Sequence, residues 1–445
     1  MYDVISIEGR NKPTAVLCSK SFVSDAKSAA SSKGMPGIRI VPESVPPEWT
    51  IMEEIQSGVT VVMDDIAAAL TKPLTAEEKS PKPEGVEKPS RIIFKGNLEE
   101  VNRFFYKRGW ADGLPIIPPT EEAVREMLTG TDLPPDHAVA KVIPRLGKAT
   151  VEKIAINAVM AGALPTYMPL LITGVQAVME KKAGFGAWEV STGSNAPCWI
   201  VNGPIRNDLN INSGSGSLSP GDIANAAIGR AMGLIIKNIG GARKGIEDMG
   251  EFGNPGKYSM VIAENEEASP WEPMHVEHGF NRGDSAVTVF FPNSFTQIFG
   301  YGSNDRGILS SIIYNVAPPR EGVTCLMLNP EHARILASKG WTKREIKVFM
   351  SEYARVPFYH LRSYWDPDLA REKKLPINPQ DSVSILNNPD SIRVLVTGGP
   401  GNWISLLLGP PSKSSDWVTK KVELPANWDK LVQKYKGIVP TYAHY

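Results

Sequence analysis

The residues best suited to chemistry lie in the segment Glu264–Phe280, ENEEASPWEPMHVEHGF. It holds five glutamates and two histidines, His275 and His278, within a short stretch. Carboxylates that crowd together raise one another's pKa, which suits a general acid or base working near neutral pH. Because Pro270 and Pro273 oppose a regular helix, we expect a shaped loop that displays these side chains.

Within this segment we predict Glu264 or Glu267 as the catalytic base and His275 as the proton donor, with Glu277 as a further catalytic residue. A second interpretation is a metal ion held by Glu264, His275, Glu277 and His278. The segment lacks the helical His-Glu-x-x-His spacing of many zinc sites, so we expect no metal and no other cofactor. A third interpretation, a solvated acidic loop, is disfavoured by the tryptophan, methionine and phenylalanine in the segment, which favour burial.

Side-chain amides beside glycines form a second group of candidates. An amide donates and accepts hydrogen bonds at once, so several amides can hold a polar substrate without fixing its charge. Two of them fall in expected helices, where Asn has no propensity advantage. The alternative is that they cap turns and satisfy buried backbone groups. We predict substrate-binding roles for Asn157, Asn195, Asn202, Asn212 and Asn225.

A Gly/Ser loop, NSGSGSLSPGDIAN at Asn212–Asn225, leads into an expected helix. Backbone N–H groups and the helix dipole would favour a phosphate or carboxylate there. We therefore add Ser213, in the loop, and Arg230, two turns into the helix, to the substrate-binding residues. The spacing matches neither a P-loop nor a dinucleotide fingerprint, and a flexible surface loop is the alternative.

The chain has three cysteines, Cys18, Cys198 and Cys325, and no Cys-x-x-Cys. An odd count without regular spacing argues against a disulfide framework or a structural zinc site and favours the reducing cytoplasm. Cys18 and Cys198, each beside an expected strand, are the possible nucleophiles. For Cys18 the alternative is a small buried apolar residue, and no His or Lys adjoins Cys198 in the sequence to lower its pKa.

Composition narrows the classes of partner. Among 445 residues, 48 Lys and Arg balance 48 Asp and Glu, so no overall charge attracts nucleic acid or an anionic membrane. We see no signal peptide and no apolar run long enough to cross a bilayer. We therefore expect a soluble cytoplasmic protein whose partners are a small-molecule substrate and either a second copy or a partner subunit.

The periodicity of apolar residues predicts an α/β fold made of a small βαβ module and a larger mixed α/β domain. Pro, Lys and Glu fill residues 72–90, a composition typical of a solvated linker. We therefore divide the chain into a module at 1–71, a linker at 72–90 and a large domain at 91–445 that we expect to be catalytic. In the module we expect strands at Thr14–Cys18 and Ile38–Val41 and helices at Val23–Ser32 and Ile51–Leu70.

In the large domain, capping residues and apolar spacing define the main elements, and we find no repeat of fixed period. The expected helices are Thr150–Ala161, one following Pro169, Asp222–Asn238, Pro330–Ser338 and Thr342–Ala354. The expected strands are Trp199–Asn202, Tyr258–Ala263, Ala286–Phe291 and Ile392–Thr397.

The segment CSKSFVSDAKSAASSKGMPGIRIVPESVP, Cys18–Pro46, resembles the second half of the UGSC-type proteins. These are small α/β bacterial proteins named for a selenocysteine- or cysteine-containing motif and loosely akin to components of glycine-reductase-like selenoenzymes. The large domain resembles proteins that often accompany them, in blocks such as WADGLPIIPPTEEAVREML, IVNGPI, ANAAIGRA and ENEEASPWEPMHVEHGF. The resemblance implies thiol or selenol chemistry, but the redox motif would precede Asn11 and this chain has neither UGSC nor CGSC.

Together these features predict an enzyme that acts on a small polar, carboxylate-bearing substrate by acid–base chemistry. The reaction would be an elimination, an addition or a carbon–heteroatom bond cleavage, as in a lyase. One alternative is a thiol-dependent, reductase-like component that works with a redox partner, and another is a non-catalytic scaffold subunit. The enzymatic interpretation requires that the acidic segment and the amides meet in one sheltered cavity.

Overall fold

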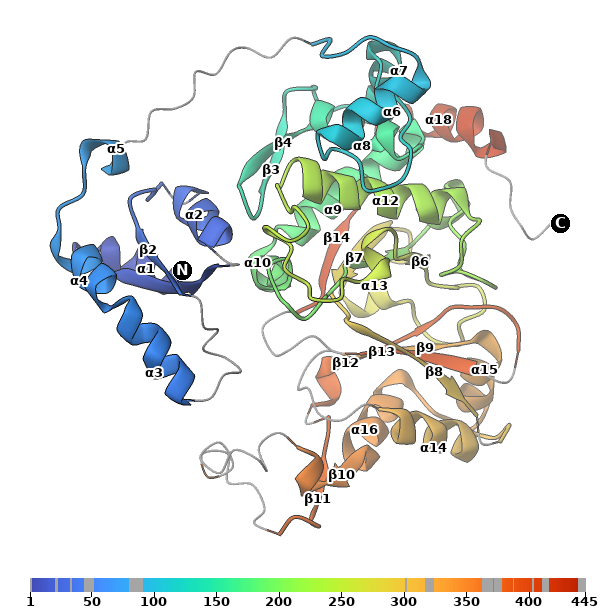
Figure 1. Ribbon diagram of the computed structural model, residues 1–445. Helices are drawn as coiled ribbons and strands as arrows, with labels where there is room; N and C mark the ends of the chain where they lie inside the picture. The colour runs from blue at the N-terminus through green and yellow to red at the C-terminus, as the bar shows by residue number, and fades with distance from the viewer. Residues whose placement is uncertain are drawn as a thin grey trace.

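The computed structural model describes residues 2–20, 23–32, 34–43, 52–79, 91–300, 302–316, 324–361, 371, 378–386, 388–401, 404–409 and 416–438 (Figure 1). Helices and small open sheets alternate along the chain, so the fold is α/β, as expected. Among these residues no helix combines the length and the apolar character needed to cross a membrane.

The N-terminal module is built on two parallel strands, β1 (Ala15–Ser19) and β2 (Arg39–Glu43), joined through helix α2 (Val23–Ser32). This is the expected βαβ unit, and a short helix α1 (Tyr2–Glu8) precedes it. The single helix expected at Ile51–Leu70 is instead two helices, α3 (Met52–Val61) and α4 (Met63–Thr71), and Ile51 lies outside the described residues. The chain turns at Val62, whose N–H bonds the carbonyl of Val59.

The expected linker is described only in part, because residues 80–90 lie outside the described ranges. Its first part is not wholly extended, since Ala76–Lys79 forms the one-turn helix α5. Thr75 and Glu78 explain this helix: each side chain bonds the backbone N–H of the other, as in a capping box.

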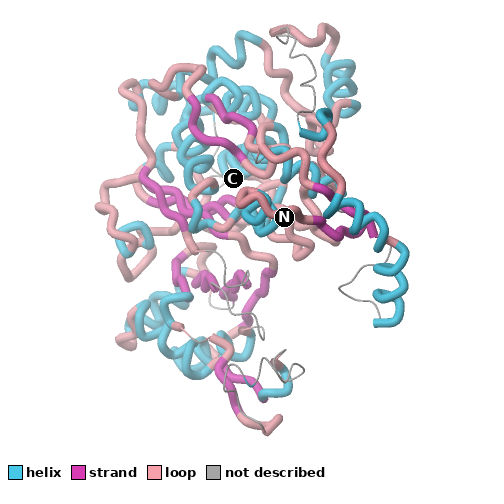
Figure 2. Tube along the Cα trace, turned by 90° about the vertical axis from the view of Figure 1, so that its left-hand side faces the viewer, coloured by secondary structure: helices cyan, strands magenta, loops and turns pink. Residues whose placement is uncertain are grey.

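The large region contains two four-stranded sheets that pack face to face between layers of helices (Figures 1 and 2). The first sheet has the order β6 (Val261–Ala263), β5 (Cys198–Asn202), β7 (Ala286–Phe290), β14 (Val418–Lys421). The second has the order β12 (Ile392–Val396), β9 (Thr324–Leu328), β13 (Ile404–Gly409), β8 (Ser294–Phe299).

Helices cover the outer face of each sheet. On the first sheet lie α9 (Met168–Val178) and α12 (Ile223–Asn238), with α8 (Val151–Met160) packed against both. On the second lie α14 (Asp305–Asn315), α15 (Pro330–Ser338) and α16 (Lys343–Tyr353). Alternation along the strands separates the cores: in β5, Trp199 and Val201 face the helices, whereas Cys198 and Ile200 face the second sheet.

The main helices begin where the sequence predicts, because their capping residues act as expected. Thr150 accepts a hydrogen bond from the N–H of Lys153 at the start of α8, and Thr342 forms a capping box with Glu345 at the start of α16. The expected strand at Tyr258–Ala263 is shorter than predicted, since only its last three residues pair. The remaining elements are α6 (Leu98–Lys107), α7 (Glu121–Met127), β3 (Ala138–Val142), β4 (Gly147–Thr150), α10 (Phe185–Trp188), α11 (Ile205–Asp208), α13 (Met274–Glu277), β10 (Arg355–Pro357), β11 (Ser382–Ser384) and α18 (Trp428–Tyr435).

The two sheets share one topology, so the chain contains an internal structural repeat, although its sequence has no repeat of fixed period. In each, a central strand pairs in parallel with the next strand of its unit and antiparallel with the one after: β5 with β6 and β7, and β9 with β12 and β13. Alignment of β5 with β9 by their sequences, CWIV and CLML, makes Cys198 equivalent to Cys325 and Val201 equivalent to Leu328. The matching sequences CWIVNGP and CLMLNP begin inside the central strands and continue past their carboxyl ends.

The repeats exchange their fourth strands. The chain leaves β7 in the first sheet and enters β8, which pairs with β13 in the second sheet. It later leaves β13 and enters β14, which pairs with β7 in the first sheet. This exchange joins the two repeats into one body, and it places the carboxyl ends of β6 and β12 beside each other, where the N–H of Asn265 bonds the carbonyl of Val396.

Candidate functional site

Glu264 is the first residue after β6 and lies fully buried where the two repeats meet. Its Oε2 accepts hydrogen bonds from Asn202 Nδ2 at 2.6 Å and from the backbone N–H of Met274 at 2.7 Å. Its Oε1 lies 3.5 Å from Lys343 Nζ and has no hydrogen-bond partner within the described ranges. The structure therefore brings the predicted base and the predicted amide of Asn202 together.

Lys343, the first residue of α16, is the buried cation of this cluster and was missed by the sequence analysis. Its ammonium group donates to the carbonyl of Glu272 at 2.7 Å and to Glu277 Oε2 at 3.0 Å. A cation in the first turn of a helix opposes the helix dipole, so a locally unfavourable residue was the available signal. Lys343 thus connects the second repeat to the acidic segment of the first.

Arg206, also missed by the sequence analysis, organises the other side of the acidic segment. It is buried in α11, and its guanidinium donates to the carbonyl of Glu264 at 2.9 Å. It forms a two-pronged ion pair with Glu267, at 3.1 and 3.0 Å, and lies 3.1 Å from Glu266 Oε1. The turn between β5 and α11 completes the contacts, since the N–H of Gly203 donates to Glu266 Oε1 at 2.7 Å.

This pairing corrects the expectation that crowding raises every carboxylate pKa in the segment. The hydrogen bonds from Arg206 outweigh desolvation and lower the pKa of Glu267 to about 2. A carboxylate with so low a pKa is a weak base at neutral pH, which disfavours the predicted role of Glu267 as the general base. Of the two glutamates predicted as the base, this leaves Glu264.

A pH dependence of stability follows from the lowered pKa. A carboxylate whose folded-state pKa lies below its unfolded value stabilises the fold above the unfolded pKa. Comparing wild type with Glu267→Gln, we expect the difference in free energy of unfolding to be full above about pH 5 and to shrink as the pH falls towards 2. Urea unfolding at several pH values measures it. A difference that does not change with pH would show that Arg206 does not hold this carboxylate ionised.

The two histidines of the segment differ in their surroundings. His275 is fully buried, with Nδ1 3.8 Å from Glu266 Oε1, and neither ring nitrogen has a hydrogen-bond partner among the described residues. His278 Nδ1 lies 2.6 Å from Thr419 Oγ1, and burial lowers the pKa of this histidine to about 4. His278 is therefore neutral at physiological pH. His275 lies in the same cluster as Glu266 and Asn202.

The four residues of the metal interpretation do not share one centre. Glu277 pairs with Lys343 and lies 3.7 Å from Lys347 Nζ, while His278 faces Thr419. In the described part of the chain, no three His, Cys, Asp or Glu side chains gather as a ligand set. The expected shaped loop is correct up to Pro273, after which α13 adds one helical turn.

A cavity of about 630 Å³ adjoins the cluster and is lined by both predicted and missed residues. Asn212 and Ser213 of the Gly/Ser loop line it, as do Arg206 and Asn207, which bind Glu267. Its full lining is Arg206, Asn207, Asn210, Ile211, Asn212, Ser213, Gly214, Ser215, Asp222 and Lys436. The cavity is thus polar, rich in amides, and bounded by cations from Arg206 and Lys436.

The amide side chains of the Gly/Ser loop are used to shape that loop. Asn225 donates to the carbonyls of Asn212, Ser217 and Val261 and accepts from the N–H of Asn212. Asn212 in turn binds the carbonyl of Ser215 and the carboxylate of Asp222. The predicted substrate-binding role of Asn225 is therefore unsupported by its contacts, because its amide is already saturated by backbone.

Three further predicted residues lie away from the cluster. Asn157 donates to the carbonyl of Lys153 at 2.9 Å and accepts from Asn238 at 2.8 Å, between α8 and α12. Arg230 pairs with Asp112 at 2.8 Å, which holds the WADGLP segment on α12. Asn195 is buried before β5. No described contact joins these side chains to Glu264, so the expectation of one cavity holding all the amides is wrong.

The possible nucleophiles are placed differently. Cys198 is fully buried between the two sheets, and this burial raises the pKa of its thiol well above the usual range. A neutral, inaccessible thiol is a poor nucleophile, which disfavours the thiol-dependent interpretation for Cys198. Cys18 is partly exposed near the carboxyl end of β1, in the N-terminal module.

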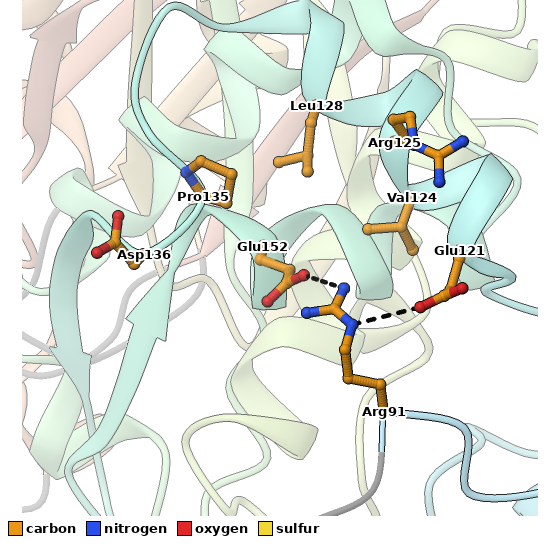
Figure 3. A pocket seen from close by; sticks show the side chains of 8 residues that line it. All are labelled: Arg91, Glu121, Val124, Arg125, Leu128, Pro135, Asp136 and Glu152. Carbon is orange, nitrogen blue, oxygen red and sulfur yellow. Dashed lines mark hydrogen bonds and ion pairs between the residues drawn. The ribbon is translucent and has the colours of Figure 1, made fainter.

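A second cavity, of about 520 Å³, lies at the start of the large region and contains none of the predicted residues. Figure 3 shows Arg91 bridging Glu121 and Glu152 beside Val124 and Leu128. These ion pairs are exposed and connect α7 with α8. Arg91 therefore links the helices α7 and α8 at the surface of the protein.

Comparison with known proteins identifies the N-terminal module. Searches among curated proteins and among solved structures each returned no match. Residues 1–72 match the model of the UGSC family, and no family model matches the rest of the chain. The chain therefore carries an N-terminal UGSC-type domain.

Proposed function

We propose that this protein is an enzyme that performs acid–base chemistry on a small, carboxylate-bearing substrate. The reaction class is elimination, addition or carbon–heteroatom bond cleavage. The observation that carries the proposal is the buried carboxylate of Glu264, held at one oxygen by Asn202 and Met274 while the other oxygen accepts no hydrogen bond from the described residues. Oε1 faces the ammonium group of Lys343 at 3.5 Å but accepts no hydrogen bond from the described residues, and a buried carboxylate oxygen left in this state supports a functional role.

In this proposal Glu264 is the base and His275 the proton donor. Lys343 and Arg206 place positive charge on either side of the acidic segment, which stabilises negative charge developing on a substrate. Arg206 also lines the adjoining cavity, so it contacts both the carboxylate cluster and the space that we propose for the substrate. With Lys436 it supplies the cations that a carboxylate substrate requires.

The cavity gives the first test. In native mass spectrometry of the full chain, we expect a small acidic ligand to be retained by the wild type and lost from Ser213→Trp, which fills the cavity. The matched control is Ser219→Trp, an exposed position in the same loop that does not line the cavity, and it should retain the ligand. Retention by both variants would place the ligand elsewhere and remove the support that the cavity gives.

A further inference from the structure

Strand β8 forms an edge of the second sheet, with its outer side unpaired among the described residues. Its sequence, SFTQIF, contains no charge, no proline and no glycine. Proteins usually protect such an edge with charged residues, prolines or a covering element, because unpaired backbone groups recruit another strand. Within the described residues β8 has none of these protections, so its unpaired backbone groups are available to another strand.

The internal repeat supplies a protected counterpart for comparison. Registers place β14 where β8 lies in the other sheet, with Trp417 equivalent to Phe295. Strand β14 carries Lys420 and Lys421, which pair with Glu180 and Asp284. Charged residues thus protect the edge strand β14, whereas the equivalent edge strand β8 carries none.

The equivalent aromatic residues differ in the same way. Trp417 is 3% exposed and stacks on Phe290, with ring centroids 3.8 Å apart. Phe295 is 56% exposed and borders a cavity of about 490 Å³ that Met260, Leu408 and Phe252 also line. Phe299, at the other end of β8, is 62% exposed. One repeat therefore buries its aromatic side chain between the sheets, whereas the other leaves Phe295 exposed beside an open groove that both polar and apolar residues line.

We propose that β8 is the interface through which a second copy of this chain binds. Two identical edge strands related by a two-fold axis pair antiparallel, which would join the two second sheets into one eight-stranded sheet. With the axis at Gln297, Phe295 of each copy lies opposite Phe299 of the other, on the same face as the open groove. Such cross-strand aromatic pairs stabilise antiparallel strands, and the uncharged sequence creates no repulsion between copies.

Opposed charges test both the interface and its register. We expect full-length wild type to sediment as a dimer, and Phe295→Glu/Phe299→Glu to sediment as a monomer because like charges then face each other across the axis. Phe295→Lys/Phe299→Lys should be monomeric for the same reason. An equimolar mixture of these two variants should recover the dimer, since every glutamate then faces a lysine.

The matched control is Tyr314→Glu/Tyr353→Glu, which places the same charges at exposed aromatic residues of the helices α14 and α16, outside the strand β8. This variant should remain dimeric, and circular dichroism confirms that each variant is folded. A monomeric wild type, or a Phe295→Glu/Phe299→Glu variant that stays dimeric, would overturn the proposal. A mixture of the two variants that stays monomeric would overturn the register, because the glutamates of one copy would then not face the lysines of the other.

Discussion

Replacement of Lys343 by Met is expected to lower the free energy of unfolding by about 3–5 kcal/mol, the cost typical of removing one partner from a buried ion pair. Lys343 is buried, and its ammonium group faces Glu264 at 3.5 Å and Glu277 at 3.0 Å. Without it, the carboxylate of Glu264 stays in the interior with no cation beside Oε1. The carbonyl of Glu272 also loses its hydrogen bond.

Urea unfolding followed by tryptophan fluorescence measures this loss. The control is Lys347→Met on the same helix, because Lys347 is more accessible and lies 3.7 Å from Glu277. A double variant, Lys343→Met with Glu264→Gln, removes both charges and should be more stable than the sum of the single losses predicts. A loss for Lys343→Met no larger than for Lys347→Met would contradict the assignment of Lys343 as the cation that stabilises Glu264.

Local signals in the sequence predicted four of the eight strands in the two large sheets, β5, β6, β7 and β12, and several of the helices that cover them. Helices with a Thr or Asn cap and a regular apolar face begin within a residue or two of their expected positions, as α8 and α16 illustrate. The helix expected at Ile51–Leu70 fails because its apolar pattern continues through Val62, where the chain turns. The spacing of apolar residues indicates which face of a helix is buried. It does not detect a turn that divides one apolar pattern between two helices.

The candidate site could be predicted only where its residues lie at the ends of strands that the sequence indicates. The acidic segment and Asn202 follow adjacent strands, β6 and β5, so their proximity was within reach. Arg206 and Lys343 contact the same segment, although they lie 58 and 79 residues from Glu264 in the sequence. Nothing in local sequence encodes such pairings, which arise from the sheet order and from the packing of the two repeats.

The amides show why residue type alone is a weak guide to function. Asn202 and Asn225 were both predicted to bind substrate, yet one binds the carboxylate of Glu264 and the other binds three carbonyls. Asn satisfies buried backbone as readily as it holds a ligand. The internal repeat could not be predicted either, because the two halves share the pairing of their strands. Their only recognisable sequence match is CWIVNGP with CLMLNP.

Replacement of Glu264 by Gln is expected to lower turnover of the native substrate by about 10²- to 10⁴-fold, the usual contribution of a general acid or base. The change keeps the size of the side chain, and the amide oxygen still accepts from Asn202 and Met274. Its NH₂ group would then face Lys343 and cannot take a proton. The substrate is the ligand identified by native mass spectrometry, and turnover is followed by its consumption in single-turnover and steady-state assays.

The matched control is Glu267→Gln, in the same segment. Because Arg206 holds the pKa of Glu267 at about 2, this carboxylate is a poor base at neutral pH, and its loss should leave turnover within a few-fold of wild type. Urea unfolding distinguishes lost chemistry from damage to the fold: Glu264→Gln should unfold cooperatively, as wild type does, while its turnover is lost. Full activity of Glu264→Gln, or equal losses of turnover in Glu264→Gln and Glu267→Gln, would exclude Glu264 as the base.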